Sequence, residues 1–444
     1  MSIETSTPVM ILQAVNHGPL GIARSLGRMG VPVYVADLDA RAPACVSRYC
    51  REVFPCRLDD AETAVRALLA ASRRIGRRPI LIPTTDDAAL FVATHQTALG
   101  DAYIGVDLDP ELVRDLCSKK RMHYLARRCG VPTAQAVFPG NRADVLAFVE
   151  NAVFPVMLKG IDGLRLWRER GERMLIVHSR GELLEAYDRL EDPRDPNLML
   201  QEYIPGGDDT VWMFNGYFNA RSECLVGVTG KKIRQYPVHR GATTLGICLR
   251  NETVAETTKA FMRAIGYRGV LDIGYRFDAR DGQYKVLDVN PRVGATFRLF
   301  ASDSGMDVVR AMYLDVTGQP VYAGTVHEGR RWIVEDFDLA SSRRYRAERT
   351  LTLGGWLRSL RGVEEAAYFA PDDLRPLLVM CADRMGELVR RVSRKVARRR
   401  RVRRATRRSA DRGPTIGAPA LGRVQDERMM CNERLAPGLD PSAG

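Results

Sequence analysis

The first hundred residues alternate between apolar, strand-like runs and segments with helical spacing. Val9 to Val15 is a short apolar run typical of a buried strand, and Ile22 to Met29 has the spacing of a helix. Val31 to Ala36 gives a second strand, so the pattern predicts a β-α-β unit within an N-terminal α/β domain. Asp37 follows, where a Rossmann domain would hold a ribose. The G-x-G-x-x-G fingerprint is absent, which argues against nucleotide binding here.

Strand-like segments return in the second half of the chain and form a predicted hairpin. Gly269 to Phe277 is rich in β-forming residues, and the turn-forming residues that follow it lead into a strand that starts at Lys285. Alternation along this second strand puts Asp288 and Asn290 on one face. Pairing across the turn brings Asp272 near Asp288, and two such carboxylates repel unless a cation or a proton lies between them.

The end of this hairpin carries the residues with the clearest chemistry. Asp288 and Asn290 offer a carboxylate and an amide oxygen, and Mg²⁺ is typically held by one or two carboxylates plus substrate phosphates. Arg292 follows with a planar cationic group that suits phosphate or carboxylate oxygens. Taken alone, D-x-N-P-R would indicate only a strand end with a proline stop and a surface arginine.

Together these residues resemble the second half of an ATP-grasp domain, the fold of D-alanine–D-alanine ligases, biotin carboxylase and the carboxylate–amine ligases. The resemblance implies that Asp272, Asp288 and Asn290 hold two Mg²⁺ (or Mn²⁺) ions. It also implies that Arg292 stabilises the transferred phosphoryl group. Some relatives carry an acid two positions further along the first strand, where this chain has Gly274.

Two lysines match ATP-binding positions of the same family. Lys119 precedes Gly130-Val-Pro by eleven residues, and Lys159 ends the apolar strand of a P-x-x-x-K motif, so the resemblance implies contacts with the ATP phosphates. A lysine at the end of an apolar strand must find an anion or extend to water. Lys119 alone would suit a solvated helix end. The glycine-rich phosphate lid of many relatives is replaced by Gly160 to Arg168, which has two glycines and two arginines.

The strand from Leu198 to Ile204 and the turn after it resemble the hinge of the ATP-grasp fold; alone they would be a plain strand and turn. The resemblance implies that this hinge binds the adenine ring and the ribose of ATP. The implied nucleotide contacts are Gln201, Glu202, Tyr203, the backbone of Ile204, and Asp208 for the ribose hydroxyls. In this family the N-terminal domain usually helps to enclose the other substrate. The residues after the strand at Pro79 suit that role, although Thr85 or Asp86 would equally serve as a helix N-cap.

A cationic cluster lies between the hinge and the hairpin. Gly230 to Gly241 includes Lys231 and Arg234, and such runs are usually solvated faces in soluble proteins. At this position in the chain, the cluster is expected to surround phosphates or a substrate carboxylate. Arg298 is expected to join it, so Lys231, Arg234, Arg298 and Arg292 are the predicted catalytic residues.

Composition excludes several other classes of protein. The net charge is +13, but Arg390 to Arg408 alone contains 12 Lys or Arg and no acid, so the charge describes a tail rather than the body. The nine cysteines occur singly, without zinc-like spacing, which indicates reduced thiols in a cytoplasmic protein. No stretch of 18 apolar residues occurs, which argues against secretion and membrane spanning.

The C-terminal segment predicts a helix that changes from apolar to basic. Seven apolar side chains between Leu374 and Leu388 would cover one broad side, and the basic run follows directly. Such a segment suits an anionic membrane surface, at the inner face of the membrane. No aromatic residue interleaves with the arginines to stack bases, which argues against nucleic acid. A helix docked on its own domain with a solvated tail fits equally well, and residues 409–444 have a disordered composition.

The sequence therefore predicts an α/β protein with a Rossmann-like domain (1–110), an ATP-grasp domain (111–325) with a smaller lid subdomain (about 132–200), a C-terminal extension (326–389) and a basic tail (390–444). The resemblance, over roughly residues 9–320, is closest to the carboxylate–amine ligase and D-aspartate ligase branch. It implies an enzyme, often dimeric, that phosphorylates a small-molecule carboxylate with ATP and joins it to an amine. Ammonia or a thiol as acceptor, or a nucleotide-binding module without catalysis, are the alternatives.

Overall fold

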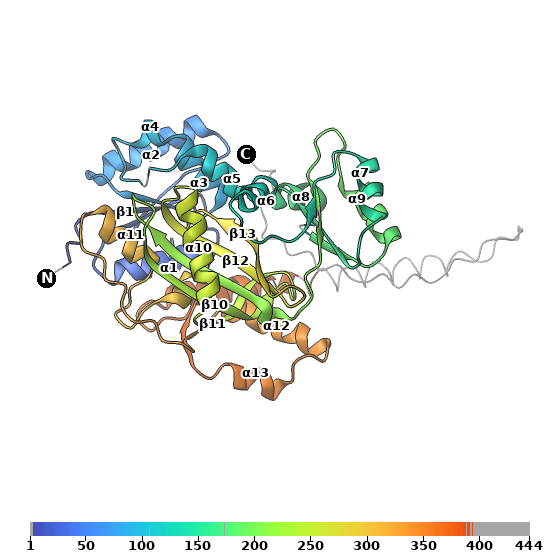
Figure 1. Cartoon of the computed structure of the whole chain (residues 1–444). Coiled ribbons are helices and arrows are strands. Elements are labelled where there is room, and N and C mark those ends of the chain that lie inside the picture. Colours follow the sequence, from blue (N-terminus) through green and yellow to red (C-terminus); the bar gives the residue numbers. More distant parts are fainter. Residues whose placement is uncertain (1–2, 106, 173, 388, 391–392, 394–444) are drawn as a thin grey trace, which may run out of the picture.

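The structure, a computed structural model, describes residues 3–105, 107–172, 174–387, 389–390 and 393. Its described strands form a parallel sheet near the N-terminus, a small antiparallel sheet, and a larger central sheet. Figure 1 shows the small sheet in a separate lobe with α7 and α9, beside a body that holds the other two sheets. The predicted α/β class is confirmed.

The N-terminal sheet has the order β3-β2-β1-β4, and its strands run parallel. Helix α1 begins at His17, five residues before the predicted start, because the Asn16 side chain accepts a hydrogen bond from the backbone of Gly18 and caps the helix. The elements are β1 (Val9–Leu12), α1 (His17–Gly27), β2 (Val33–Ala36), β3 (Cys50–Phe54), α2 (Ala61–Ile75), β4 (Ile80–Pro83), α3 (Asp86–Thr94) and α4 (Gln96–Leu99). The helices α5 (Pro110–Cys117) and α6 (Lys119–Arg128) connect this domain to the rest.

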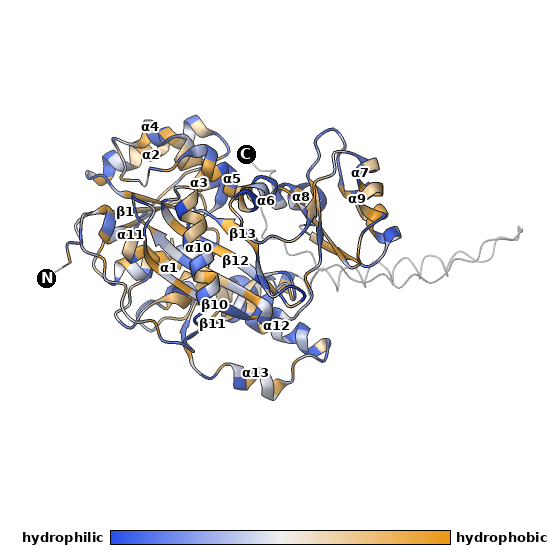
Figure 2. Cartoon of the chain, viewed as in Figure 1, coloured by the Kyte–Doolittle hydropathy of each residue, from blue (hydrophilic) through white to orange (hydrophobic). Residues whose placement is uncertain are grey.

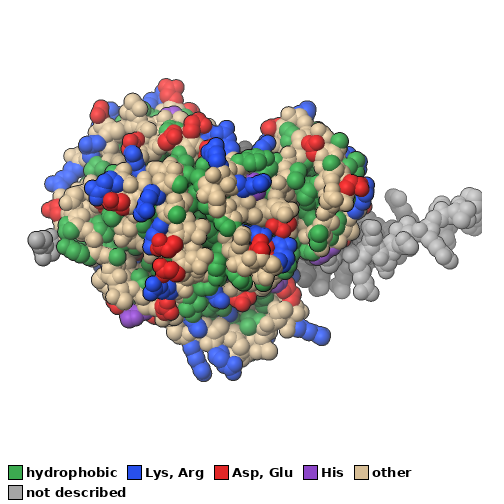
Figure 3. Space-filling model, in the orientation of Figure 1, with side chains coloured by type: hydrophobic (Ala, Val, Ile, Leu, Met, Phe, Trp, Pro, Cys, Tyr) green, Lys and Arg blue, Asp and Glu red, His purple; other side chains and the backbone are tan. Residues whose placement is uncertain are grey.

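The smaller lobe is an antiparallel sheet of order β5-β8-β6-β7 with an apolar core of its own. Its elements are β5 (Ala136–Val137), α7 (Arg142–Val149), β6 (Val156–Gly160), α8 (Gly163–Arg170), β7 (Met174–Val177), α9 (Arg180–Leu190) and β8 (Leu198–Glu202). The segment compared above with a phosphate lid is therefore mostly helix, since α8 begins three residues after β6 ends. Figure 3 shows the molecular surface hollowed between this lobe and the body.

The central sheet has the order β13-β12-β9-β10-β11-β14-β15. Its elements are η1 (Asp208–Thr210), β9 (Val211–Phe218), β10 (Cys224–Tyr236), β11 (Ala242–Cys248), α10 (Glu252–Ala264), β12 (Gly269–Asp278), β13 (Gln283–Asn290), η2 (Phe297–Phe300), α11 (Val308–Val316), β14 (Arg331–Ile333), α12 (Glu335–Ala347), α13 (Leu353–Ser359) and β15 (Val363–Ala366). Because β14 and β15 lie at one edge, the C-terminal extension continues the same sheet.

The two faces of the central sheet are covered differently. Alternate residues such as Phe214, Leu271 and Ile273 pack on one face with α6 and α10. The residues between them, such as Tyr217 and Val270, pack on the other face with α11 and the N-terminal domain. Figure 2 shows this interior as apolar strands beneath helices with polar outer sides. On the second face, the apolar residues of β12 end at Val270. Asp272, Gly274 and Arg276 follow on the same face toward the turn.

Buried charge joins the C-terminal extension to the sheet. Arg234 on β10 forms two hydrogen bonds with Asp338 on α12, at 2.8 Å and 2.9 Å, and both side chains are almost fully buried. The same carboxylate accepts hydrogen bonds from Trp356 Nε1 and Thr244 Oγ1. A buried ion pair of this kind is costly to break, because removal of one partner leaves an uncompensated charge.

The C-terminal helix, described for residues 375–387 and 389–390, has two unlike sides. Leu377 and Met380 pack against the core near Trp332, whereas Leu378, Met385 and Val389 are exposed. The predicted broad apolar side is thus divided between a docked and an exposed face. Most of the basic run, and residues 409–444, lie outside the described residues. Among the described helices, none is long and apolar enough to cross a membrane.

We expect Asp338→Ala to lower the free energy of unfolding by about 3–5 kcal/mol, because Arg234 would stay buried without its counter-charge. The exposed pair between Arg142 and Asp188 provides the matched control, and Asp188→Ala should cost under about 1 kcal/mol. Urea unfolding followed by circular dichroism measures both variants. Equal losses in the two variants would contradict the role given to the buried pair.

Candidate active site

The register of the hairpin brings the predicted metal-binding residues together. Asp272 lies directly opposite Asn290, and Asp288 lies opposite Gly274. The Asn290 amide nitrogen is 3.4 Å from a carboxylate oxygen of each aspartate. Asp288 is exposed, while Asp272 and Asn290 are partly buried. The expectation that Asp272 and Asp288 lie close together is met, although they are offset by two residues rather than directly paired.

Two glycines make room for these carboxylates. A β-carbon at Gly274 would stand 2.6 Å from Asp288 Oδ1, so the Asp288 carboxylate fills the space that a side chain at 274 would need. A β-carbon at Gly294 would stand 2.4 Å from Asp272 Cγ. Both contacts are shorter than van der Waals distance. The loop after β13 therefore closes on Asp272, and the glycine at 274 is required by the present position of Asp288.

The environment of Asp272 favours a cation. Burial and the neighbouring Asp288 raise the pKa of Asp272 to about 6, while Arg292, Asn215 and Lys232 act in the opposite direction. The described residues hold no cluster of three or more His, Cys, Asp or Glu that would cage a metal by itself. Two carboxylates and an amide supply only part of the coordination shell of Mg²⁺, and water and substrate phosphates would supply the other ligands.

Lysines from two elements meet in front of this face. Lys159 ends β6 inside the smaller lobe, and its ammonium donates a 2.7 Å hydrogen bond to Gln201 Oε1. Burial, together with the charge of Lys119, lowers the pKa of Lys159 to about 8. The Lys119 ammonium lies 3.2 Å from the point where a β-carbon of Gly163 would stand, at the start of α8. Two neighbouring cations of this kind form a place for an anion.

The cationic cluster predicted from sequence is divided by strand alternation. Residues 230–236 belong to β10 rather than to a loop. Lys231 extends over the Trp212 ring, 5.5 Å from its centroid, on the face packed with α10. Lys232 points to the opposite face, where Asp288, Asp272 and Asp208 act on its pKa, which burial lowers. Of the cluster, Lys232 is therefore the cation nearest the carboxylates, and Lys231 and Arg234 are directed elsewhere.

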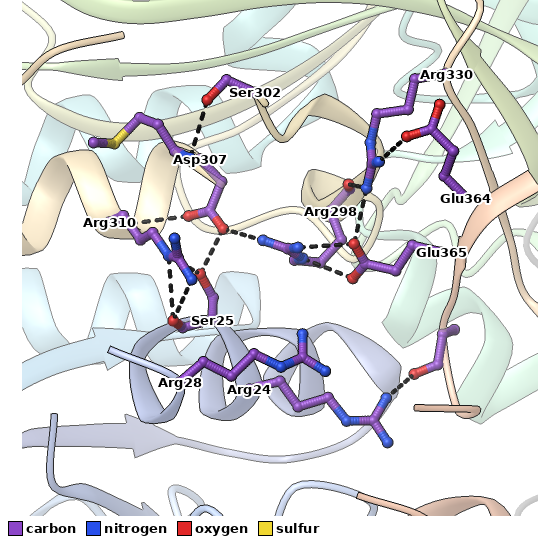
Figure 4. Close-up of polar contacts among 12 residues, drawn as sticks. Arg24, Ser25, Arg28, Arg298, Ser302, Asp307, Arg310, Arg330, Glu364 and Glu365 are labelled. Atoms are coloured by element: carbon purple, nitrogen blue, oxygen red, sulfur yellow. Dashed lines mark hydrogen bonds and ion pairs between the residues drawn. The ribbon is translucent and has the colours of Figure 1, made fainter. Parts of the chain in front are cut away.

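Arg298, the fourth predicted catalytic residue, takes part in a different network. Its guanidinium is buried and bonds Asp307 at 2.5 Å and Glu365 at 2.8 Å and 2.7 Å. Figure 4 shows this arginine between the two acids, with Arg310 and Ser25 alongside. The network ties α1, α11 and β15 together. In this structure Arg298 has a bridging position between domains, and sequence reasoning had no means of finding its partners.

Arg292 is held in the site by the N-terminal domain. Its Nε donates to Asp86 Oδ1 at 2.8 Å, and its Nη2 donates to Asn290 Oδ1 at 3.1 Å. Thr85 provides the N-cap of α3, which leaves the Asp86 carboxylate for Arg292. Thr85 is therefore the helix cap, whereas Asp86 faces Arg292. The sequence placed Asp86 either in the loop that encloses the other substrate or at a helix cap, and it gave no sign of the contact with Arg292.

The hinge residues of β8 are fixed by their neighbours. The Glu202 carboxylate accepts hydrogen bonds from Lys285 at 3.3 Å and Arg280 at 2.8 Å, so its side chain is already engaged. Arg276 lies over the Tyr203 ring, 5.6 Å from its centroid, and donates to the Gly206 carbonyl. Ile204 is buried. The resemblance did not identify Arg276, although alternation along β12 places it on the same face as Asp272.

Asp208 already has hydrogen-bond partners as well. It accepts a 2.7 Å hydrogen bond from Gln235 Nε2 and another from the Tyr345 hydroxyl on α12. His239 in the following turn contacts Tyr345 edge-on and bonds Glu348 at 2.8 Å. The C-terminal extension thus reaches the carboxylate expected to bind a ribose. A ribose hydroxyl would have to share this carboxylate with Tyr345 or displace it.

The residues present fit a nucleotide with a divalent cation. Lys119 and Lys159 offer charge for phosphate oxygens, and Asp272, Asp288 and Asn290 offer oxygen ligands for Mg²⁺. The hinge Gln201–Ile204 lies at the junction of the two lobes, where an adenine would have an apolar neighbour in Ile204. The geometry can therefore align a polyphosphate between the lysines of β6 and α6 and the carboxylates of the central sheet.

Comparisons with known proteins agree with this geometry. No protein-family model matches the chain. The D-aspartate ligase of Enterococcus faecium (strain Aus0004) is 24% identical over 323 residues, which cover 70% of this chain and 76% of the relative. An ADP complex of N5-carboxyaminoimidazole ribonucleotide synthetase superposes with a TM-score of 0.58 at 12% identity, covering 74% of this chain and 81% of that one. The L-amino acid ligase from Bacillus licheniformis superposes with a TM-score of 0.55 at 16% identity, covering 74% and 79%.

Sequence relatedness and fold agree with the arrangement of the site. The lysine pair, the hinge, and the Asp–Asn hairpin occur in the order that the resemblance implied, and they converge in space. The chain is therefore similar in sequence to a D-aspartate ligase, and it shares its fold with the carboxyaminoimidazole ribonucleotide synthetase and the L-amino acid ligase.

Proposed function

We propose that this protein is an ATP-dependent ligase that activates a carboxylate as an acyl phosphate and joins it to an amine. The observation that carries the proposal is the convergence of Lys119 and Lys159 with Asp272 and Asp288 beside Arg292. Neighbouring ammonium groups attract a polyphosphate, and the carboxylates accept Mg²⁺. The D-aspartate ligase relative makes an amino acid a fitting carboxylate.

The reaction has two balanced steps. A carboxylate oxygen of the substrate attacks the γ-phosphorus of ATP, so an acyl phosphate forms and ADP leaves. The amine then attacks the acyl carbon and expels phosphate, and the proton lost from nitrogen passes to solvent or to phosphate. Bound Mg²⁺ supplies charge that is spread over the transferring phosphoryl oxygens.

The chain's own residues align the two reactants. Lys159 from the smaller lobe and Lys119 from α6 hold the phosphates, and Arg292 contacts the transferring group from the central sheet. Asp86 fixes the direction of the Arg292 guanidinium, so the N-terminal domain takes part in phosphoryl transfer. Lys232 supplies a cation for a substrate carboxylate on the same face.

We predict that MgATP binding above pH 8 takes up a proton at Lys159. Its pKa is about 8 in the free protein, so part of the population is neutral at pH 8.5, and a bound phosphate raises the pKa again. Calorimetry in buffers with different ionisation enthalpies measures the uptake. Lys159→Arg should abolish it, because arginine stays charged at this pH.

Lys231→Arg is the matched control for that measurement, since Lys231 lies over Trp212 on the opposite face of β10. Proton uptake in this variant should equal that of the unaltered protein. An unchanged uptake in Lys159→Arg would contradict a phosphate contact at Lys159. No MgATP binding by the unaltered protein would contradict the function itself.

We predict that hydroxylamine traps the acyl phosphate as a hydroxamate only when a suitable acid is present. Amino acids, including D-aspartate, are the first acids to test, followed by dipeptides and small hydroxy acids. Arg292→Lys should lower the rate by roughly 100-fold, because a single ammonium cannot keep both the Asp86 and Asn290 contacts and reach phosphoryl oxygens.

The same assay separates the alternatives. Asp288→Asn should remove hydroxamate formation with the fold unchanged, while Arg142→Lys, on the surface of the smaller lobe, should keep the full rate. Folded protein that binds ATP but yields no hydroxamate with any acid would favour a nucleotide-binding module. The helical α8 in place of a flexible lid is the observation that keeps this second candidate. Ammonia or thiol acceptors would appear as products in the second step.

Two finer expectations accompany the ligase proposal: peripheral association with an anionic membrane surface, as part of a cytoplasmic location, and a homodimer. The docked helix leaves Leu378, Met385 and Val389 exposed along one side, next to a sequence of 12 basic residues between Arg390 and Arg408. Apolar side chains beside basic ones suit a surface of anionic lipid. Light scattering in solution tests the dimer.

We predict that the full-length protein co-sediments with vesicles containing anionic lipid, and that a chain shortened to end at Val389 loses most of this binding. Each basic residue near the surface contributes on the order of 1 kcal/mol, so binding should weaken as salt is added. Vesicles of zwitterionic lipid alone are the control. Equal binding by both chains would exclude the tail as an anchor.

A further inference from the structure

Asn215 on β9 is buried beside the predicted cation site, and its side-chain amide lacks well-formed hydrogen bonds to the residues that the structure describes. Its side chain has no exposed surface, and within the described residues neither its amide nitrogen nor its oxygen makes a well-formed hydrogen bond. Its amide is nevertheless close enough to Asp272 to lower the pKa of that carboxylate by hydrogen bonding. Buried amides almost always have partners, so an unsatisfied one requires an explanation.

The register of the sheet places Asn215 in line with the predicted ligands. Asp272 is directly opposite Asn215 on one side and directly opposite Asn290 on the other. Directly paired residues point to the same face, roughly 5 Å apart from strand to strand. Asn215, Asp272 and Asn290 thus form one row across β9, β12 and β13. The next residue in the row is Val228 on β10, which packs against the apolar core. Asn215 is therefore the last polar residue of the row.

A neighbouring row explains why this amide matters in this chain. The next row on the same face has Gly274 opposite Asp288, and Asp288 fills the space above that glycine. No acid stands on β12 opposite Asp288, so Asp272 is the carboxylate that β12 contributes, with Asn290 beside it on β13 and Asn215 beside it on β9. Asn215 is the polar side chain that faces Asp272 from β9.

We propose that Asn215 is a positioning residue of the cation site, whose amide holds the Asp272 carboxylate in the orientation that binds the divalent cation. This inference rests on the proposed function only in taking Asp272 as a ligand. Residues that orient a metal ligand commonly change metal affinity by 10–100-fold when they are replaced. A purely apolar side chain would pack at this position without any unsatisfied polar atom.

The test compares stability without metal and affinity for metal in the same variants. Asn215→Leu removes both polar atoms at similar volume, so the metal-free protein should melt at a higher temperature than the unaltered protein. The same variant should bind Mn²⁺ about tenfold more weakly in the presence of ATP, as measured from free Mn²⁺ by electron paramagnetic resonance. Higher stability with weaker metal binding is a pattern that a structural asparagine would not give.

Asn251→Leu is the matched control, since Asn251 is another buried asparagine of the central domain whose side chain accepts a hydrogen bond as the N-cap of α10. This change should lower the melting temperature and leave Mn²⁺ affinity unchanged. Asn215→Asp adds a carboxylate next to Asp272, so it should lower the metal-free melting temperature and increase the rise produced by Mn²⁺. It tests the inference even if Asn215→Leu fails to fold.

The inference is overturned if Asn215→Leu binds Mn²⁺ within twofold of the unaltered protein, as a buried water satisfying the amide would produce. It is also overturned if Asn215→Asp destabilises the protein without any larger response to Mn²⁺. Absence of Mn²⁺ binding by the unaltered protein with ATP would instead refute the proposed function, so the two failures are distinguishable.

Discussion

The site depends on one constraint, the repulsion between like charges on a partly buried face of the central sheet. Asp272 and Asp288 repel each other on β12 and β13, and Lys119 and Lys159 repel each other in front of them. Burial and the like-charged neighbour raise the pKa of Asp272, and burial with the charge of Lys119 lowers the pKa of Lys159. Repulsion of this kind is costly in a partly buried site, and the proposed ligand, which carries both phosphate and a divalent cation, would relieve it.

Three separate parts of the chain hold this face in position. The N-terminal domain contributes Asp86 to Arg292, and the smaller lobe contributes Lys159. The C-terminal extension reaches Asp208 through Tyr345 and anchors β10 through the buried Asp338. Because each contact crosses an element boundary, the orientation of the charged groups depends on how the lobes and the extension pack. The position of Asp208, next to the predicted hinge, is therefore coupled to the contacts of α12.

The turn between β10 and β11 connects these parts directly. His239 bonds Glu348 after α12, while Arg240 donates to the Met174 carbonyl on β7 of the smaller lobe at 3.1 Å. A change in the position of the smaller lobe would act on α12 through this turn, and through Tyr345 on Asp208. The extension thus packs against the predicted nucleotide-binding residues, in keeping with its two strands at the edge of the central sheet.

The sequence alone determined the elements and the residue types of the site. Period-two and helical spacing located the β-α-β opening and the hairpin that carries Asp272 and Asp288, because those patterns follow from local burial. Ordered motifs located Lys119, Lys159 and the hinge. Only the tertiary structure decided which way the cationic cluster faces, since the expected loop is a continuation of β10 and alternation then separates Lys231 from Lys232. It also decided the partners of Arg298, Arg234, Asp86 and Asn215, because these contacts join residues distant in sequence and have no local pattern from which to be inferred.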